Sequence, residues 1–335
     1  MKVCVVGAGA IGGYLAVKLA KAGVEVTVII RGANLAAVKA NGMKLIEDGS
    51  EHVERSMTAT DKLAEAGAQD LVILAMKAHQ VTPIANQLES LLGPETVIVT
   101  MQNGVPWWYF QKHDGEYSGR WVESVDPGGT IAAHIPIDKV IGCVVYPACE
   151  IVAPGVIRHI EGNRFPLGEL DGAETPRVAA IAELFKKAGF KSPVLTNIRS
   201  EIWLKLWGNL TFNPISAVTH ATLVDICQFP PTRALAANMM TEAQSIANKL
   251  GIEFRVSLEK RIAGAEGVGK HKTSMLQDVE AGRALEIDAL VGSVIELGRL
   301  TKTPTPHIDA MYACTSLLAS MLRESGGRLT ISKAN

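Results

Sequence analysis

The chain has 335 residues, of which 33 are Lys or Arg and 34 are Asp or Glu, so its formal net charge is −1 at pH 7. This balance excludes the basic surface typical of nucleic-acid-binding proteins, and no apolar run approaches the ~20 residues that cross a bilayer. The length predicts about two domains. The apolar run after Lys2 gives way to glycines after four residues, which argues against a signal peptide.

The five cysteines are scattered without C-x-x-C spacing, and the eight histidines show no paired spacing of the kind found in metal sites. Reduced thiols explain this pattern better than disulfides or zinc. We therefore expect a cytoplasmic protein without a bound metal.

The first element in the chain, residues 2–13, reads KVCVVGAGAIGG. Its four consecutive apolar residues predict a strand buried on both faces, and a glycine turn with G-x-G-x-x-G spacing follows before a run of helical periodicity. This context is the dinucleotide-binding fingerprint, in which the glycines permit the turn, the approach of a pyrophosphate and close helix packing. A plain βα turn is the alternative. The residues predicted to bind the dinucleotide are Gly7, Ala8, Gly9, Ala10, Ile11 and Gly12.

The second predicted strand, residues 25–30, ends at Arg31. A site for NAD usually has Asp or Glu near this position, where the carboxylate binds the ribose 2′-hydroxyl. An arginine suits a 2′-phosphate instead, which predicts NADPH as the cofactor. The alternative is a solvated arginine at the end of a strand.

Two more buried strands, residues 71–76 and 96–101, are followed by Lys77 and by Gln102-Asn103-Gly104. Ligands of open α/β sheets gather beyond the carboxyl ends of the strands. We therefore expect Lys77 near the cofactor phosphates or ribose and Asn103 in contact with a ligand. An exposed loop lysine and ordinary Asn-Gly turn chemistry are the alternatives.

Two segments of the first half do not follow this strand pattern. Residues 43–58 alternate weakly around a turn and predict a peripheral hairpin.

The segment from Pro106 to Pro136 is irregular and rich in aromatic rings, which suits a lid over the substrate, a subunit contact or a satellite core. These three alternatives stay open, and its rings are Trp107, Trp108, Tyr109, Phe110 and Trp121.

Further strands are expected at residues 140–152, 155–161 and 190–195, with a helix at 175–188. Beyond about Asn197 strand patterns cease and 3.6-residue periodicity takes over. This change predicts an α/β Rossmann-type N-terminal domain over residues 1–196 and an all-α C-terminal domain over residues 197–335.

The helix predicted to begin at Ile198 carries the strongest catalytic pattern of the second half. Lys205, Asn209 and Asn213 recur at intervals of four beside a Trp-rich apolar face. Asparagine is a poor helix former, so a purely solvated face explains this line less well than a polar wall of a cleft does. The alternative is a surface ion pair between Glu201 and Lys205.

Two later residues complete the set of candidates. Ser274 is expected to cap a helix, with Gln277 three positions on as in a capping box, and the same geometry can bind an anion. Glu286 opens a further predicted helix, where the pattern alone does not separate an exposed carboxylate from a functional one.

Taken together, these motifs resemble the ketopantoate reductase (2-dehydropantoate 2-reductase) family over nearly the whole chain. The resemblance implies NADPH-dependent reduction of 2-dehydropantoate to (R)-pantoate in the biosynthesis of pantothenate and coenzyme A, at a cleft between the two domains. The matching motifs are the residues 7–13 turn, Arg31, Met76-Lys77-Ala78, Gln102-Asn103-Gly104, Lys205-x3-Asn209-x3-Asn213-Pro214, residues 274–278 and residues 286–288.

The resemblance also implies roles for single residues. Lys205 would donate the proton to the ketone oxygen, because an ammonium can both stabilise and protonate the oxygen that gains charge during hydride addition. Glu286 would organise the nicotinamide ribose and the lysine. Arg31 and Lys77 would hold the adenosine 2′-phosphate. The implied substrate contacts are Asn103, which would lie between cofactor and substrate, Lys205, Asn209, Asn213 and, for the carboxylate, Ser274.

The chain departs from the family pattern at three places. His271 stands where the family often has an asparagine. Thr222 and Leu223 occupy a region where many members have a second, substrate-facing asparagine. The aromatic segment is longer than the usual connection in the family. A sister NADPH-dependent reductase of another 2-oxo acid is therefore an alternative, and a catalytically silent NADPH-binding protein is a weaker one. The expected binding partner is a small 2-oxo acid. We expect the protein to bind neither nucleic acid nor a membrane. The sequence does not decide whether the chain forms a homodimer.

Overall fold

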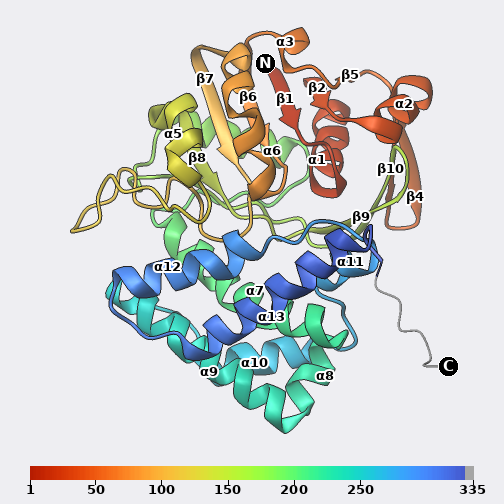
Figure 1. Cartoon of the computed structure of the whole chain (residues 1–335). Helices are drawn as coiled ribbons and strands as arrows, with labels where there is room; N and C mark the ends of the chain where they lie inside the picture. Colours follow the sequence, from red (N-terminus) through yellow and green to blue (C-terminus); the bar gives the residue numbers. More distant parts are fainter. Residues whose placement is uncertain (329–335) are drawn as a thin grey trace, which may run out of the picture. The chain divides into compact units, whose positions relative to one another are not determined.

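The computed structural model describes residues 1–328, and the chain divides into two compact units (Figure 1). The first unit comprises residues 1–103, 107–121 and 126–198. The second comprises residues 104–106, 122–125 and the chain from Arg199 onward. The predicted C-terminal domain extends to residue 335, so its residues 329–335 lie outside the described part.

The first unit is built on a seven-stranded sheet with the order β11-β8-β7-β6-β1-β2-β5. Neighbouring strands are parallel, except that β11 runs antiparallel to β8. This is the Rossmann-type arrangement that the sequence predicts. The strands are β1 (Lys2–Val6), β2 (Glu25–Ile29), β5 (Thr58–Thr60), β6 (Gln69–Leu74), β7 (Leu92–Thr100), β8 (Val140–Cys143) and β11 (Leu167–Glu169).

The longest helices of this unit are α1 and α6, with 12 residues each, and α2 has 10. The α-helices are α1 (Ala10–Lys21), α2 (Gly32–Asn41), α3 (Leu63–Ala66), α4 (Ala85–Leu88), α5 (Thr130–His134) and α6 (Pro176–Lys187). The 3₁₀ turns are η1 (Ala78–Gln80), η2 (Thr82–Ile84), η3 (Glu89–Leu91), η4 (Pro127–Gly129) and η5 (Ile137–Lys139).

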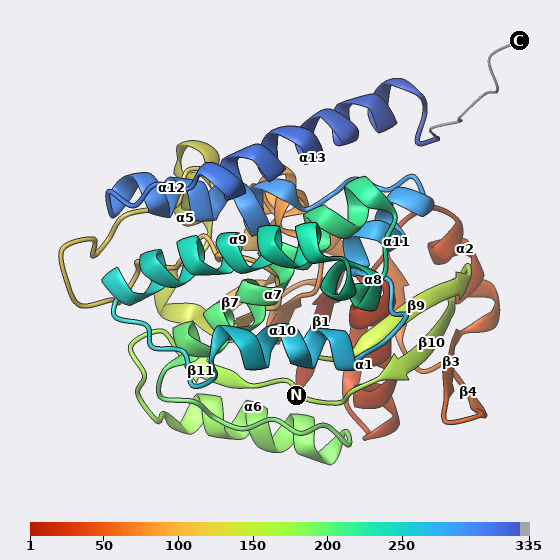
Figure 2. The ribbon, with the colours of Figure 1, turned by 90° about the horizontal axis from the view of Figure 1, so that it is seen from below.

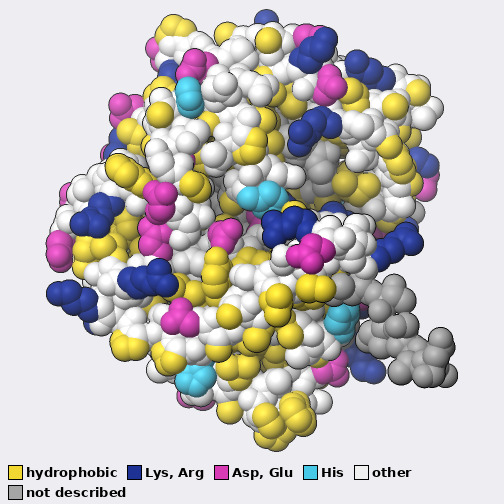
Figure 3. Space-filling view, viewed as in Figure 1, with side chains coloured by type: hydrophobic (Ala, Val, Ile, Leu, Met, Phe, Trp, Pro, Cys, Tyr) yellow, Lys and Arg dark blue, Asp and Glu magenta, His cyan; other side chains and the backbone are white. Residues whose placement is uncertain are grey.

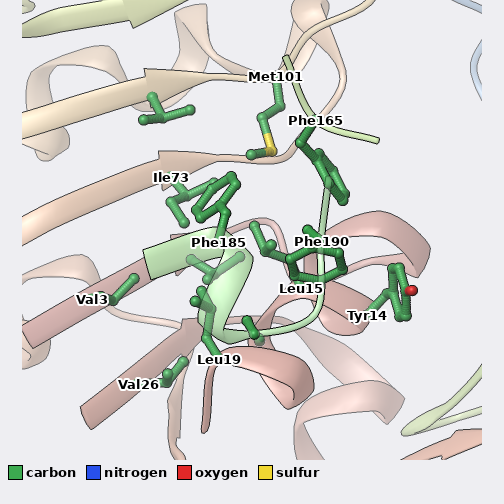
Figure 4. Packing of buried hydrophobic residues seen from close by; sticks show 14 of the residues in the cluster. Val3, Tyr14, Leu15, Leu19, Val26, Ile73, Met101, Phe165, Phe185 and Phe190 are labelled. Carbon is green, nitrogen blue, oxygen red and sulfur yellow. The ribbon is translucent and has the colours of Figure 1, made fainter. Parts of the chain in front are cut away.

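The core of the first unit lies where α1 and α6 cover one face of the sheet (Figure 4). Leu15 and Leu19 of α1 and Phe185 of α6 pack over strand residues such as Val3 and Ile73. Phe185, Phe165 and Phe190 meet edge to face, with ring centroids 4.9 to 6.1 Å apart. The consecutive apolar residues of β1 are all fully buried, as expected for a strand covered on both faces.

A second sheet of four strands, in the order β4-β3-β10-β9, lies in the same unit. The predicted hairpin of residues 43–58 is confirmed as β3 (Met43–Glu47) and β4 (Ser50–Glu54), joined by Asp48 and Gly49, which both have positive φ. It is not isolated, because β3 also pairs in parallel with β10 (Val156–Glu161). The fourth strand is β9 (Ala148–Ala153).

The strand predicted at residues 190–195 is wrong. The segment makes only isolated bridges, between Arg164 and Lys191 and between Leu167 and Val194. Pro193 lies between them and has no backbone N–H to donate, which limits a regular ladder.

The aromatic segment mostly packs inside the first unit. Trp107, Trp108, Tyr109 and Phe110 are at most 4% exposed, and the Trp108 indole N–H donates to Thr100 Oγ1 at 2.8 Å. Of the three alternatives, the packing therefore favours a satellite core for these four rings. Trp121, the fifth ring, is 53% exposed and is not part of this packing.

The second unit is helical, and no strand is assigned among its described residues, 104–106, 122–125 and 199–328. Glu296 binds residues 122–125 into this unit, since its carboxylate accepts from the backbone N–H groups of Glu123 and Ser124 at 2.9 and 2.8 Å. The elements are α7 (Ile198–Thr219), α8 (Leu223–Gln228), α9 (Pro230–Lys249), α10 (Leu258–Gly267), α11 (Ser274–Glu280), the π-helical turn η6 (Asp288–Gly292), α12 (Ser293–Leu300) and α13 (Pro306–Glu324). None of the described helices is both long and apolar enough to cross a membrane.

Candidate active site

The glycine turn between β1 and α1 has a different constraint at each glycine. Gly7 has φ of +89°, and a Cβ placed on it would lie 2.7 Å from the Met76 Cβ. A Cβ on Gly12 would lie 2.4 Å from the Gly7 carbonyl oxygen. Around Gly9, by contrast, nothing lies within 4 Å of the Cβ position. The turn is therefore tightly packed at its first and third glycines and open at its second, where a pyrophosphate would need room.

The turn also presents the N-terminus of α1. Gly9 is the N-cap residue and makes no side-chain cap, while the N–H groups of Gly7 and Ala8 both donate to the Ile29 carbonyl, at 3.1 and 3.2 Å. These bonds fix the turn to the end of β2. The first N–H groups of a helix have no intrahelical partner, and with the helix dipole they favour an anion. A dinucleotide phosphate therefore fits the turn.

The other candidate residues of the first unit follow strands whose carboxyl ends are in register. Val6 pairs with Ile29 on one side and with Leu74 on the other, and Leu74 pairs with Thr100. Strand β1 is thus the point where the strand order reverses, which is where open α/β sheets bind ligands. The order along this edge is Arg31, the glycine turn, Lys77 and Asn103.

Exposure differs along this edge. Arg31 is exposed two residues after the end of β2, while Lys77 and Asn103 are partly buried. The strands of Arg31 and Lys77 lie two spacings apart, about 10 Å. The packing of Gly7 against Met76 brings the residue before Lys77 onto the glycine turn.

Gln102 has a role that sequence reasoning missed. Its side-chain amide donates to the carbonyl oxygens of Leu74 and Met76, at 2.8 and 3.1 Å, and so ties the end of β7 to the end of β6. Gln80 Oε1 similarly accepts from the Lys77 backbone N–H at 3.1 Å. These two amides hold the backbone around Lys77 and Asn103. A long amide side chain next to a strand end was the only indication in the sequence.

In the helical unit, α7 presents Lys205, Asn209 and Asn213 one turn apart along one side. Lys205 and Asn209 are partly buried and Asn213 is 5% exposed. The buried side of the helix is fixed by Trp207, whose indole N–H donates to the Met240 carbonyl at 2.8 Å and whose ring stacks on Phe254 at 4.0 Å between centroids. The polar line therefore stands on a helix that Trp207 anchors in the helical unit.

The structure brings Ser274 next to this line, since the Asn213 side-chain amide donates to the Ser274 hydroxyl at 3.5 Å. The expected capping role of Ser274 is wrong, because Thr273 is the N-cap of α11 and its hydroxyl accepts from the Leu276 N–H at 3.2 Å. Two adjacent hydroxyl residues can each cap a helix, and the sequence does not decide between them. Ser274 is the first residue of α11 and is exposed.

Glu286 is partly buried and lies two residues before a turn of π-helix, η6, which the sequence did not reveal. The turn is held from two sides. The Val105 N–H donates to the Ala289 carbonyl at 3.0 Å, and the Tyr312 hydroxyl donates to Asp288 at 2.8 Å. This last bond, with burial, raises the pKa of Tyr312. Single π-helical turns within helices occur often at functional sites.

Two positions that depart from the family pattern lie side by side. The Leu223 N–H donates to the His271 carbonyl at 3.1 Å, and the Val224 N–H donates to the Gly269 carbonyl at 3.2 Å. The start of α8 is thus bound to the loop that leads to Ser274.

A Rossmann-type sheet with an open glycine turn at its switch point is the arrangement found in dinucleotide-binding proteins, a class that includes many oxidoreductases. Residues 3–113 match the family model described as ketopantoate reductase PanE/ApbA, and residues 197–319 match its C-terminal model. The chain is 56% identical to 2-dehydropantoate 2-reductase of Mesorhizobium japonicum, over 95% of this chain and 98% of that protein. It therefore belongs to the ketopantoate reductase family.

Solved structures agree with this assignment. A crystal structure from Ralstonia solanacearum MolK2, provisionally named a ketopantoate reductase, has a TM-score of 0.91 at 43% identity and covers 96% of this chain and 98% of that chain. D-mandelate dehydrogenase, in a structure with NADH and anilino(oxo)acetate, has a TM-score of 0.81 over 96% of this chain and 99% of that chain. Its identity is 21%, so it shows a shared fold alone.

Proposed function

We propose that this chain is an NADPH-dependent reductase that converts 2-dehydropantoate to (R)-pantoate in the cytoplasm. The observation that carries the proposal is the 56% identity to a 2-dehydropantoate 2-reductase over nearly the whole of both chains. The glycine turn supports a nicotinamide cofactor, since its second glycine leaves the space that a pyrophosphate needs. Arg31 supports the choice of NADPH, because a guanidinium at the end of β2 can pair with a 2′-phosphate.

Within this proposal the first unit binds the cofactor and the helical unit supplies the proton. The bound cofactor supplies the hydride. Residues 7–12 would hold the pyrophosphate, Arg31 and Lys77 the 2′-phosphate, and Asn103 would contact both ligands. Lys205 would protonate the substrate ketone oxygen, and Glu286 would orient the lysine and the nicotinamide ribose.

The substrate would be held by the polar line of α7 and its neighbour. Asn209 and Asn213 offer amide donors and acceptors, and the Ser274 hydroxyl lies 3.5 Å from the Asn213 amide nitrogen. We assign the substrate carboxylate to Ser274. Developing negative charge on the ketone oxygen would be stabilised by the Lys205 ammonium, because preorganised charge of opposite sign lowers the barrier most effectively in a partly desolvated site.

Reduction of a different 2-oxo acid is the second candidate function. The observation that favours it is the paired segment of Leu223 and His271, which places two departures from the family pattern in one local structure. A changed substrate pocket would leave the Lys205 chemistry intact and alter the group carried beyond the ketone.

The experiment that tests both candidates is NADPH oxidation by the purified chain with a panel of 2-oxo acids that includes ketopantoate. The proposal expects ketopantoate to give the highest kcat/KM. A higher value for another acid would favour the second candidate, and no oxidation with any acid would contradict both. Lys205→Ala should lower kcat by several orders of magnitude while NADPH still binds, and Lys260→Ala, an exposed change on α10, is the matched control.

A further inference from the structure

The π-helical turn η6 releases one backbone carbonyl from the hydrogen-bond pattern of its helix. The Ser293 N–H donates to the Asp288 carbonyl, five residues back, rather than to Ala289, which an α-helix would use. The Ala289 carbonyl is therefore available to other donors. Ala289 is 4% exposed, and a buried carbonyl is rarely left without a hydrogen bond. The donors that this carbonyl accepts from therefore show what the turn holds in place.

Two donors bind the released carbonyl of Ala289. The Val105 N–H donates to it at 3.0 Å, and the Ser293 hydroxyl donates to it at 2.7 Å. Ser293 and Val105 are at most 1% exposed, so both bonds lie away from water. The Ser293 hydroxyl thus takes the place of the helical N–H that bonds to Asp288 instead, and the second position on the oxygen holds the backbone of Val105.

Gly104 is fitted to the same carbonyl. Its φ is +92°, and a Cβ placed on it would lie 2.1 Å from the Ala289 oxygen and 2.5 Å from the carbonyl carbon. A side chain at this position would push the loop away from the turn, and the positive φ also favours glycine. Gly104 therefore allows the Val105 N–H to reach the Ala289 carbonyl.

Helix α13 supports the turn from another side. Figure 2 shows α13 along the outer side of the helical unit, and in Figure 3 hydrophobic side chains gather over its middle. The Tyr312 hydroxyl donates to Asp288 at 2.8 Å, and its ring lies 3.2 Å from the position of a Cβ on Gly292. The π form is therefore held by side chains of α12 and α13 as well as by the loop at Val105.

The two residues next to this contact both have roles in the proposed reaction. Asn103 directly precedes Gly104, and Glu286 lies three residues before Ala289. We propose that the Ala289 carbonyl fixes the backbone that carries Asn103, and that Ser293 is a positioning residue of the reaction that acts through Asn103. This inference rests on the proposed function, in which Asn103 contacts both cofactor and substrate.

A purely structural role for Ser293 is the alternative, because hydroxyl residues inside helices commonly donate to the carbonyl four residues back. Thr211, Thr301 and Thr315 do so in this chain, at 3.0, 2.9 and 2.7 Å. Those bonds join residues of a single helix or its end. The Ala289 carbonyl differs, since it also accepts from Val105 in a distant part of the sequence. The two roles predict different results when the hydroxyl is removed.

The first test measures hydrogen exchange of the Val105 amide by NMR in the full chain without cofactor. Ser293→Ala should raise the exchange rate by about tenfold, because the Ala289 carbonyl can then return to an α-helical bond and release Val105. Thr315→Val is the matched control. It removes an equally buried hydroxyl, bonded at 2.7 Å to the Met311 carbonyl, and should leave the exchange of Val105 unchanged. Unchanged exchange of Val105 in a folded Ser293→Ala variant would overturn the proposal.

The second test asks whether the contact acts through Asn103. Ser293→Ala and Gly104→Ala should each lower kcat/KM for the 2-oxo acid by about fivefold, and neither should lower it further in an Asn103→Ala background. Gly251→Ala is the matched control for backbone strain, since Gly251 has φ of +77° with nothing within 4 Å of its Cβ position, and it should keep the wild-type kcat/KM.

The kinetic outcomes separate this inference from the proposed function. Additive losses in the Asn103→Ala background would overturn the positioning role and leave the ligand contact of Asn103 intact. A wild-type kcat/KM in Asn103→Ala alone would contradict the role of Asn103 in the proposed function, and the positioning role with it.

Discussion

The guanidinium of Arg261 in α10 lies directly against Gly208 of α7. A Cβ placed on Gly208 would stand 2.2 Å from Nη2 and 3.0 Å from Cζ of Arg261. Gly208 is buried and lies one turn after Lys205 and directly before Asn209. Glycine inside a helix costs about 1 kcal/mol relative to alanine. Glycine at position 208 therefore destabilises the helix but leaves room for the Arg261 guanidinium beside the polar line of α7.

Gly208→Ala should lower kcat/KM several-fold with little change in melting temperature. The gain in helix propensity offsets part of the cost of moving the Arg261 side chain, while the displaced charge changes the surroundings of Lys205 and Asn209. The check is a double-mutant cycle with Arg261→Ala, measured by steady-state kinetics. If both changes act through the same guanidinium, their effects on kcat/KM are not additive. Additive effects would show that the two residues act separately.

The glycine turn offers a pair of substitutions with opposite consequences. Gly9→Ala meets nothing within 4 Å and its φ of −74° suits alanine, so the variant should fold and melt as the wild type does. Its methyl group would occupy the space assigned to the pyrophosphate, so the Kd for NADPH should rise at least tenfold. Gly12→Ala meets the Gly7 carbonyl and should lower the melting temperature instead. Calorimetry measures the melting temperature of both variants, and NADPH titration measures their Kd for the cofactor. Normal NADPH affinity in Gly9→Ala would contradict the assignment of the pyrophosphate to the space beside Gly9.

The parts of the fold that depend on local pattern could be predicted from the sequence. The buried run before Gly7, the strands that end before Arg31 and Lys77, and the intervals of four from Lys205 all carry short-range information. Each prediction used the periodicity or the turn chemistry of one segment. The alignment of the strand ends then followed from the general rule for parallel sheets.

What could not be predicted depends on contacts between distant segments. The bonds from Glu296 that bind residues 122–125 into the helical unit cross more than 170 positions of sequence. The parallel pairing of β3 with β10, over a hundred positions apart, turns a peripheral hairpin into part of a second sheet. Thr273 rather than Ser274 caps α11, because it is Thr273 that has the extended backbone angles of an N-cap, with φ of −64° and ψ of 157°. Neighbouring residues of like chemistry give no sequence signal for such choices.

The proposed pairing of Arg31 with the 2′-phosphate predicts a change in cofactor preference. Arg31→Ala should raise KM for NADPH by at least tenfold and leave KM for NADH nearly unchanged, because only NADPH has the phosphate. Lys39→Ala, an exposed change in the last turn of α2, is the control and should affect neither value. Measurements at two salt concentrations should show the NADPH effect shrinking as salt screens the exposed pair. Equal effects on the two cofactors would remove Arg31 from this role.

Glu47 connects the second sheet to α1 and should make stability depend on pH. Its carboxylate accepts from the Tyr14 hydroxyl and from Lys18 Nζ, both at 2.9 Å. Burial alone would raise the pKa of Glu47, but these two hydrogen bonds, with the charges of Lys18 and His159, bring the pKa below its ordinary value. A carboxyl whose pKa is lower in the folded state stabilises the fold above its unfolded pKa. This stabilisation is lost as the pH falls through the folded pKa.

Glu47→Gln should therefore lower the free energy of unfolding by about 1 kcal/mol at neutral pH, and the difference from wild type should vanish as the pH falls below the folded pKa of Glu47. Urea unfolding followed by circular dichroism from pH 7 down to acid measures the difference directly. Glu51→Gln in the same hairpin is the matched control. The Glu51 side chain is 57% exposed and pairs with Lys44 at 2.7 Å, so its removal should change stability by a few tenths of a kcal/mol at most. A difference between Glu47→Gln and wild type that stays constant with pH would show that the carboxylate charge does not hold α1 to β3.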